Sequence, residues 1–193
     1  MRVLILSPYP EKLLSAIAAT GDAADTMERA IDSQTLVAGE YGYVICYGYR
    51  HILGPAEIEA MQGRIINLHI SLLPWNRGAD PNFWSVADQT PSGVTIHVID
   101  EGIDTGPILF QSALKIGPDD TLSNSYWKLR SAVEVLFRDS WPAIRAGKIT
   151  ARPQTGPGSS HHSVDKDRFF YLLPDGWDTT VKVARKIISK HRE

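Results

Sequence analysis

The sequence predicts an α/β protein with a Rossmann-like, mainly parallel sheet and helices on both faces. Short apolar runs without alternation, such as Val3–Leu6, indicate strands that are buried on both faces. Segments with helical spacing of apolar residues, such as Glu11–Thr20, lie between these strands. Strands that alternate with helices favour βαβ units, and right-handed crossovers place helices on both faces of the sheet. Ligands of such sheets bind beyond the carboxyl ends of the strands, so polar residues that follow strands are of most interest.

The elements follow one another in the order that this fold requires. The segment Glu11–Thr20 is predicted as a helix because its apolar residues share one side and Gly21 can end it. A second helix is predicted at Glu28–Glu40, with Leu36 among its inward residues. Runs rich in β-branched and aromatic residues predict the strands. These are Val3–Leu6, a very short one within Asp22–Met27, Tyr43–Tyr49, Arg64–Ser71, Val94–Asp100 and Ile108–Ile116.

The segment Thr121–Ile144 is the strongest helix prediction, because apolar residues repeat in it every three or four positions. Asp119, Asp120 or Thr121 can cap its start, and Gly147 follows its end. Pro142 should kink the helix or separate its last turn. A loop at Arg152–Ser163 and a final helix at Thr179–Lys190, capped by Asp178, complete the chain.

Length and composition limit the class of protein. The 193 residues predict one domain at 1–150 and a small extension of loop and helix at 151–193. The net charge of −2 argues against a protein held to nucleic acid by bulk charge. One cysteine excludes an internal disulfide and a cysteine-rich zinc site. The apolar run after Arg2 is too short for a signal peptide or a membrane span, so we expect a soluble, cytoplasmic protein without a membrane partner.

A polar cluster lies on the predicted strand Arg64–Ser71. The two-residue period places Asn67, His69 and Ser71 on one side of this strand. For a lone histidine, a solvent-facing strand edge or a hydrogen-bonded core histidine would be the more common explanation. Here the strand runs into a loop that contains Pro74 and Gly78, which is typical of a site at a strand end.

An acidic loop, Asp100–Pro107, follows the predicted strand Val94–Asp100. An ordinary acidic turn is the simple interpretation, but an aspartate near His69 would orient and charge the imidazole. Asparagine, histidine and aspartate without a nucleophile favour acyl transfer, in which an amide and an imidazolium stabilise an oxyanion. The motifs of serine hydrolases, P-loop nucleotidases and dinucleotide enzymes are missing from the sequence.

Three motifs occur in one order: Tyr47–Leu53, then Asn67–Pro74 followed by Arg77-Gly78, then Gly93–His97 with Asp100–Gly106. Together they resemble those of the 10-formyltetrahydrofolate-dependent formyltransferases, which include glycinamide ribonucleotide formyltransferase, methionyl-tRNA formyltransferase and the sugar N-formyltransferases. The resemblance covers about residues 43–111 and continues weakly to the C-terminus. It implies the formyltransferase fold with a shortened N-terminal half before Tyr43.

The resemblance also implies roles for individual residues. Asn67, His69 and Asp104 match the catalytic triad: Asn67 and protonated His69 stabilise the oxyanion, while Asp104 keeps His69 charged and helps to remove the amine proton. The formyl donor is 10-formyltetrahydrofolate, and no metal is needed. The residues implied in binding the donor are Tyr49, Arg50, His51, Ile52, Leu53, Ile99, Asp100, Glu101 and Gly102.

Departures from the family pattern concern the acceptor. Ser7-Pro8-Tyr9-Pro10 replaces the glycine-rich loop that would hold a ribonucleotide phosphate, and the segment after Gly147 is too short for a tRNA-binding barrel. We therefore predict a small-molecule amine, first an amino sugar nucleotide, with Ser7, Tyr9, Arg77 and Asn82 as candidate contacts and no nucleic acid partner. A hydrolase of 10-formyltetrahydrofolate and a folate-binding module with little catalysis are the alternatives. A homodimer and a monomer both stay open.

Overall fold

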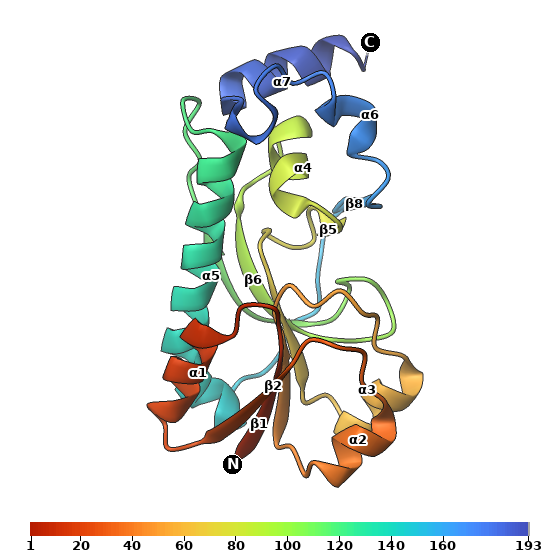
Figure 1. Cartoon of the computed structure of the whole chain (residues 1–193), viewed down its shortest axis with the longest axis vertical. Helices are drawn as coiled ribbons and strands as arrows, with labels where there is room; N and C mark the ends of the chain where they lie inside the picture. Colours follow the sequence, from red (N-terminus) through yellow and green to blue (C-terminus); the bar gives the residue numbers. More distant parts are fainter. Residues whose placement is uncertain (193) are drawn as a thin grey trace. The chain divides into compact units, whose positions relative to one another are not determined.

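The computed structural model describes residues 1–192, in which a six-stranded sheet is flanked by helices (Figure 1). The strand order is β2-β1-β3-β4-β6-β7. The strands are β1 (Arg2–Leu6), β2 (Ala23–Met27), β3 (Tyr43–Cys46), β4 (Ile65–His69), β6 (Gly93–Val98) and β7 (Ile108–Ala113). Each predicted strand is therefore confirmed, with ends that differ by a few residues.

The sheet is mainly parallel, as predicted. Strand β1 pairs in parallel with β2 and β3, and β3 pairs in parallel with β4. The last two strands run antiparallel, because Val98 N–H bonds to Pro107 O at 2.9 Å and Leu114 N–H bonds to Ser92 O at 2.9 Å. Because these two strands are antiparallel, the short acidic loop connects them and no crossover helix is needed. The loop therefore begins directly at the end of β6.

The helices include several that the sequence pattern did not predict. The predicted helices correspond to α1 (Glu11–Ala18), α2 (Ser33–Ala38), α5 (Leu122–Arg145) and α7 (Val181–Lys190). Short helices α3 (Pro55–Met61), α4 (Pro81–Ala87) and α6 (Asp167–Phe170), a 3₁₀ turn at Gly176–Asp178 and a two-stranded pairing of β5 (Arg77–Gly78) with β8 (Ser160–His161) were not predicted. These elements are too short to show a clear hydrophobic period.

Three details of the helix predictions were wrong. The helix predicted at Glu28–Glu40 begins only at Ser33, because Asp32 Oδ1 accepts the Thr35 N–H at 2.7 Å and caps the chain there. Helix α5 continues through Pro142 to Arg145, so its last turn is not separated. Thr180, not Asp178, precedes the first turn of α7.

The chain forms two compact units, each assembled from three segments. Unit 1 comprises residues 1–69, 96–110 and 133–154, and unit 2 comprises residues 70–95, 111–132 and 155–192. Both units therefore take residues from either side of position 150. The separation of a domain at 1–150 from an extension at 151–193 stays a prediction.

Each unit has its own hydrophobic core. In unit 1, side chains from β1, β3 and β4 pack with α2 and α3, and the buried set includes Leu4, Leu36 and Met61. In unit 2, Phe83 and Trp84 of α4 pack against Val181 and Ile188 of α7. These buried side chains explain why helices as short as α2 and α4 are stable, since tertiary packing supplies most helical stability.

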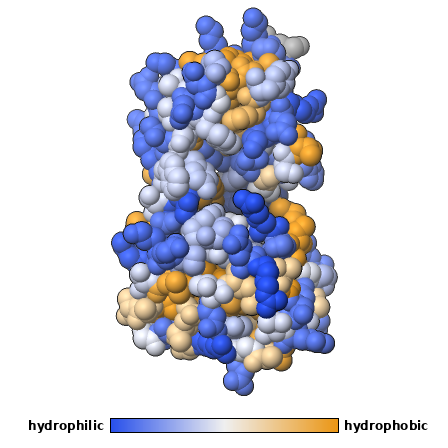
Figure 2. Space-filling view, in the orientation of Figure 1, coloured by the Kyte–Doolittle hydropathy of each residue, from blue (hydrophilic) through white to orange (hydrophobic). Residues whose placement is uncertain are grey.

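Hydrophilic residues cover most of the face drawn in Figure 2, with smaller groups of hydrophobic residues between them. Some large apolar side chains are exposed, among them Ile52 and Ile103, which are 82% and 51% exposed. Within residues 1–192, no helix is long and apolar enough to cross a membrane.

Candidate functional site

The predicted triad residues lie together in unit 1. Asn67 and His69 stand two positions apart at the carboxyl end of β4, and Asp104 lies in the loop between β6 and β7. Asn67 Nδ2 donates to Asp104 Oδ1 at 3.0 Å, and His69 Nδ1 lies 3.5 Å from Asp104 Oδ2. The side chains of His69 and Asp104 are only 8% and 13% exposed. The carboxylate thus orients both neighbours in a site with little water, where charges interact more strongly.

His97 of β6 belongs to the same cluster. Its Nε2 lies 3.3 Å from Asp104 Oδ1 and 3.3 Å from Asn67 Nδ2. Its Nδ1 lies 2.8 Å from Val98 O, and a carbonyl only accepts, so Nδ1 carries a proton. A neutral His97 therefore accepts a hydrogen bond from Asn67 at Nε2. In the sequence, the alternation that puts His97 and Thr95 on one side of β6 was the signal that could have identified His97 as a site residue.

The loop that carries Asp104 is tightly constrained. Asp104 has a φ of 52°, in the left-handed region that few side chains adopt. Asp100 Oδ1 accepts from Gly102 N–H at 3.1 Å and from Thr105 Oγ at 2.6 Å. A Cβ on Gly106 would lie 1.8 Å from Val98 O, so only glycine fits. The sequence of this loop therefore fixes the direction in which Asp104 leaves the backbone.

The segment predicted to bind the donor follows β3 in unit 1. Arg50, His51 and Ile52 are exposed, and Leu53 is buried in the core of this unit. The Tyr49 hydroxyl donates to Arg29 O at 3.0 Å, and burial raises the pKa of this phenol. The structure thus leaves three of the five predicted residues accessible to a ligand, while their contact with folate stays a prediction.

The second predicted donor segment, Ile99–Gly102, leads from β6 into the loop of Asp104. Glu101 and Gly102 are exposed, and Ile99 and Asp100 are half-buried. The Asp100 carboxylate already bonds within the loop, so any contribution to folate binding comes in addition to a structural role.

Two predicted acceptor residues follow β1 in unit 1. Ser7 is buried, and its Oγ accepts the Tyr9 N–H at 3.1 Å, which tightens the turn. The Tyr9 ring packs edge-on against Tyr47, with 4.7 Å between ring centroids. A Cβ on Gly48 would lie 1.8 Å from the Tyr9 hydroxyl. Tyr9 thus packs onto the start of the segment predicted to bind folate.

The other two predicted acceptor residues lie in unit 2. Arg77 is half-buried on β5, and its N–H bonds to Ser159 O at 2.9 Å. Asn82 is only 3% exposed; its Nδ2 donates to Leu122 O at 2.9 Å and its Oδ1 accepts from Ser125 Oγ at 2.9 Å. Asn82 therefore joins α4 to the start of α5, and a contact with an acceptor stays a prediction for both residues.

An aromatic stack in unit 2 joins Trp84 of α4 to His161 of β8. The ring of Trp84 lies 3.9 Å from that of His161, with 4° between the planes. His161 Nε2 lies 2.8 Å from Asp88 Oδ2, and Arg192 Nη2 lies 2.6 Å from Asp88 Oδ1. Burial lowers the pKa of His161. The stack occupies the Trp84 face that could otherwise receive a ligand.

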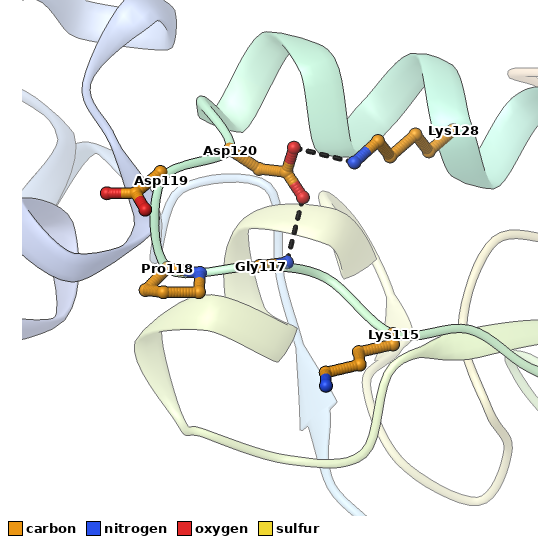
Figure 3. A pocket seen from close by; sticks show the side chains of 6 residues that line it. All are labelled: Lys115, Gly117, Pro118, Asp119, Asp120 and Lys128. Atoms are coloured by element: carbon orange, nitrogen blue, oxygen red, sulfur yellow. Dashed lines mark hydrogen bonds and ion pairs between the residues drawn. The ribbon is translucent and has the colours of Figure 1, made fainter.

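A surface depression of about 400 Å³ lies in unit 2 and contains no residue of the triad. Asp120 accepts there from Lys128 Nζ at 2.6 Å and from Gly117 N–H at 2.8 Å (Figure 3). Its lining is Lys115, Gly117, Pro118, Asp119, Asp120 and Lys128. Two lysines and two aspartates line the depression, so it has no net charge to attract a ligand.

One further side chain, Cys46, has a simple explanation. It is buried at the end of β3, and burial raises the pKa of its thiol to about 12, which fits a structural role. Over residues 1–192, no group of three or more histidine, cysteine, aspartate or glutamate side chains could hold a metal ion.

Comparison with known proteins identifies the family. The formyl transferase family model matches residues 12–138, which include all three triad residues. A crystal structure of the formyltransferase PseJ from Anoxybacillus kamchatkensis is 42% identical, with a TM-score of 0.91 over 97% of this chain and 100% of that one. The chain belongs to the formyltransferase family. That PseJ structure is a complex with UDP-4,6-dideoxy-4-formamido-L-AltNAc and tetrahydrofolate.

Other members of the formyltransferase family differ in length. Methionyl-tRNA formyltransferase of Thermodesulfovibrio yellowstonii is 38% identical over 78% of this chain but only 46% of its own length. The chain thus spans about half the length of the curated relatives it matches. A sugar N-formyltransferase from Shewanella has the same fold, with 22% identity and a TM-score of 0.80 over 98% of this chain and 87% of that one.

Proposed function

We propose that this protein transfers a formyl group from 10-formyltetrahydrofolate to the amine of an amino sugar nucleotide. The cluster of Asn67 and His69 at the end of β4 with Asp104 of the loop between β6 and β7 carries the proposal. A hydrogen bond at 3.0 Å and an ion-pair contact at 3.5 Å bring an amide, an imidazole and a carboxylate to one place without a nucleophilic side chain. This set suits attack by an external amine, with electrostatic stabilisation of the oxyanion.

In the proposed reaction the acceptor amine attacks the formyl carbon and forms a tetrahedral oxyanion. When His69 is protonated, its Nδ1–H faces Asp104 and its Nε2–H can donate to the oxyanion. Asn67 Nδ2 has a second N–H, which points at His97 Nε2. This N–H, rather than the first, can be shared with the oxyanion, because a carboxylate is the stronger acceptor and keeps the first.

The proton balance involves the same residues. The attacking amine loses one proton, which Asp104 receives directly or through His69, and the N10 atom of the folate takes up a proton as its bond to the formyl carbon breaks. The products are the formamide and tetrahydrofolate. No redox partner is required.

The loops at this edge of the sheet suit a flat aromatic donor. Ile52 follows β3 and Ile103 follows β6, and both side chains expose most of their apolar surface. Exposed apolar side chains in loops beside a catalytic cluster favour binding of a ring system, since binding removes that surface from water. We therefore assign the donor to the loops at residues 49–53 and 99–102.

The choice of acceptor rests on similarity over whole chains. The match to PseJ covers the full length of the PseJ chain. The match to methionyl-tRNA formyltransferase leaves about half of that relative's chain uncovered. A UDP-linked amino sugar is therefore the first acceptor to test. We also infer a cytoplasmic location, catalysis without a metal and no nucleic acid partner.

An assay of tetrahydrofolate release tests the proposal. The protein is incubated with 10-formyltetrahydrofolate and, separately, UDP- and dTDP-linked amino sugars, glycinamide ribonucleotide and methionyl-tRNA. We expect release with an amino sugar nucleotide, and a loss of at least about 100-fold in Asn67→Ala and in His69→Ala. The control His162→Ala, in an exposed loop of unit 2, should retain full activity. Full activity in both site variants would contradict the mechanism.

The same assay separates the two alternatives. Release of tetrahydrofolate without any amine would show the hydrolase, with water in place of the acceptor. Binding of folate without release in any mixture would show a binding module. Release with methionyl-tRNA alone would replace the proposed acceptor but retain the proposed chemistry.

A further inference from the structure

Gln154 contacts the backbone of the loop that carries Asp104. Its Nε2 donates to Asp104 O at 2.7 Å and to Gly106 O at 2.9 Å. Gln154 follows α5 in the chain and lies outside residues 12–138, the part that the family model matches. A side chain from beyond that part thus holds the backbone on both sides of Thr105.

The backbone near Gln154 is itself fixed to unit 1. Arg152 N–H bonds to Ile108 O at 2.9 Å, and Ile108 N–H bonds to Arg152 O at 2.8 Å. This antiparallel bridge joins the segment to the first residue of β7. Gln154 stands two residues further along the same segment, so its side chain reaches the loop from a backbone that is already anchored.

The backbone conformation of Asp104 explains why such a contact matters for this loop. A non-glycine residue with a left-handed backbone, such as Asp104, is strained and persists only where its surroundings enforce it. The carboxamide of Gln154 has two N–H hydrogens, one for each carbonyl. A carboxylate at the same place has only acceptor atoms and would face two further acceptors.

We propose that Gln154 is a positioning residue, which holds the Asp104 backbone so that its carboxylate stays within reach of Asn67 and His69. The effect on rate rests on the proposed function, but the effect on geometry does not. Gln154 touches neither reactant in this proposal; it acts only through Asp104.

Kinetics of three variants test the rate effect. We expect Gln154→Ala to lower kcat by about 10- to 100-fold with little change in KM, because a small displacement of a catalytic group has an effect of this size. Gln154→Glu should be at least as slow, and Gln154→Asn, which retains a shorter donor, should be intermediate. Gln34→Ala, at an exposed position of α2, is the matched control and should be unchanged.

A second measurement needs no substrate. The imidazole signals of His69 are followed by NMR over a pH series in the free protein and assigned with the His69→Gln variant. A carboxylate beside an imidazole favours the charged ring, so its displacement in Gln154→Ala should move the titration midpoint of His69 down by about half a unit. Gln34→Ala should not move it. The Asn variant provides the same test if the Ala variant fails to fold, which circular dichroism shows.

The outcomes are distinct. If kcat and the His69 midpoint are both unchanged in folded Gln154→Ala, the positioning role is wrong. If the midpoint moves but the wild-type protein formylates no acceptor, Gln154 positions Asp104 and the proposed function is wrong instead. A rise in KM without a change in kcat or midpoint would also overturn the proposal, because it would indicate contact with a substrate.

Discussion

His97 Nε2 lies 3.3 Å from Asp104 Oδ1, so the carboxylate predicted to pair with one imidazole faces two. The two rings lie at right angles, with 6.3 Å between their centroids and 82° between their planes. The Asn67 amide lies in the same group, and its Nδ2 faces both Asp104 and His97. Four side chains, rather than three, therefore define the protonation and orientation of the site.

We expect His97→Leu to lower kcat by about 10-fold, because Asn67 loses an acceptor that fixes its amide. The loss should be smaller than in His69→Ala, which removes a donor to the oxyanion. Steady-state rates of both variants measure the difference. An equal or larger loss in His97→Leu would assign a direct catalytic role to His97, and an unchanged rate would make it a packing residue.

The contact between Tyr9 and Gly48 predicts a selective effect on donor binding. Gly48 has a φ of 64°, and an added Cβ would collide with the Tyr9 hydroxyl. Gly48→Ala should therefore displace the segment at 49–53 and raise KM for the formyl donor several-fold more than KM for the acceptor. Gly21→Ala is the matched control, since Gly21 also has a positive φ but nothing lies within 4 Å of its added Cβ. Equal donor KM in both variants would contradict the assignment.

The ion pair of buried Asp22 with half-buried Arg145 predicts a pH-dependent stability. Asp22 accepts from Arg145 Nη2 at 2.8 Å, and this guanidinium holds the pKa of the carboxyl far below its usual value of 3.8. The pair therefore stabilises the fold fully above about pH 5, and the stabilisation decreases as pH falls through the acid range. Asp22→Asn should cost about 3 kcal/mol at neutral pH.

Urea unfolding at several pH values measures this cost. The difference between wild-type protein and Asp22→Asn should shrink steadily below about pH 4, because the wild-type carboxyl is then protonated in the unfolded state. Asp139→Asn is the control: Asp139 is also paired with an arginine but is 59% exposed, so its replacement should cost little. A difference that stays constant with pH would contradict the ion-pair explanation.

The stack of His161 on Trp84 predicts a second pH effect, in unit 2. Burial lowers the pKa of His161 below 6.5, so the folded state prefers the neutral ring. This contribution to stability is present above the unfolded pKa and is lost as pH falls through the folded pKa. His161→Phe keeps a ring against Trp84 but cannot titrate. As pH falls from about 8 to 5, the hydrogen-exchange protection factors of α4 and α7 should therefore decrease less in this variant than in wild type.

Much of the fold could be predicted from local pattern. The apolar runs of β1 and β3 and the period of α5 depend on residues close in sequence, so they were visible without a structure. The short elements α4, β5 and β8 could not be predicted, because distant partners stabilise them. The same reason applies to the stack of Trp84 on His161, because α4 and β8 lie far apart in the sequence.

The candidate site also contains some residues that local sequence pattern identified and others that only the structure revealed. Asn67, His69 and Asp104 followed from the alternation on one strand and from a motif resemblance, and the structure brings all three within hydrogen-bonding or ion-pair distance. The roles of His97 and Gln154 depended on contacts across 30 to 50 positions of sequence. Asn82 was predicted as a contact of the acceptor, but its buried hydrogen bonds to Leu122 and Ser125 could not be inferred from the sequence.

The sequence by itself determined the family, the parallel α/β plan and the chemical types at the end of β4, because periodicity and motif order are local properties of a chain. Only the tertiary structure decided which side chains surround Asp104. Its left-handed backbone, the two imidazoles and the Gln154 contact come from segments that meet only when the sheet and α5 are assembled. The physical reason is that hydrogen bonds and burial depend on distance in space, which spacing in sequence does not specify.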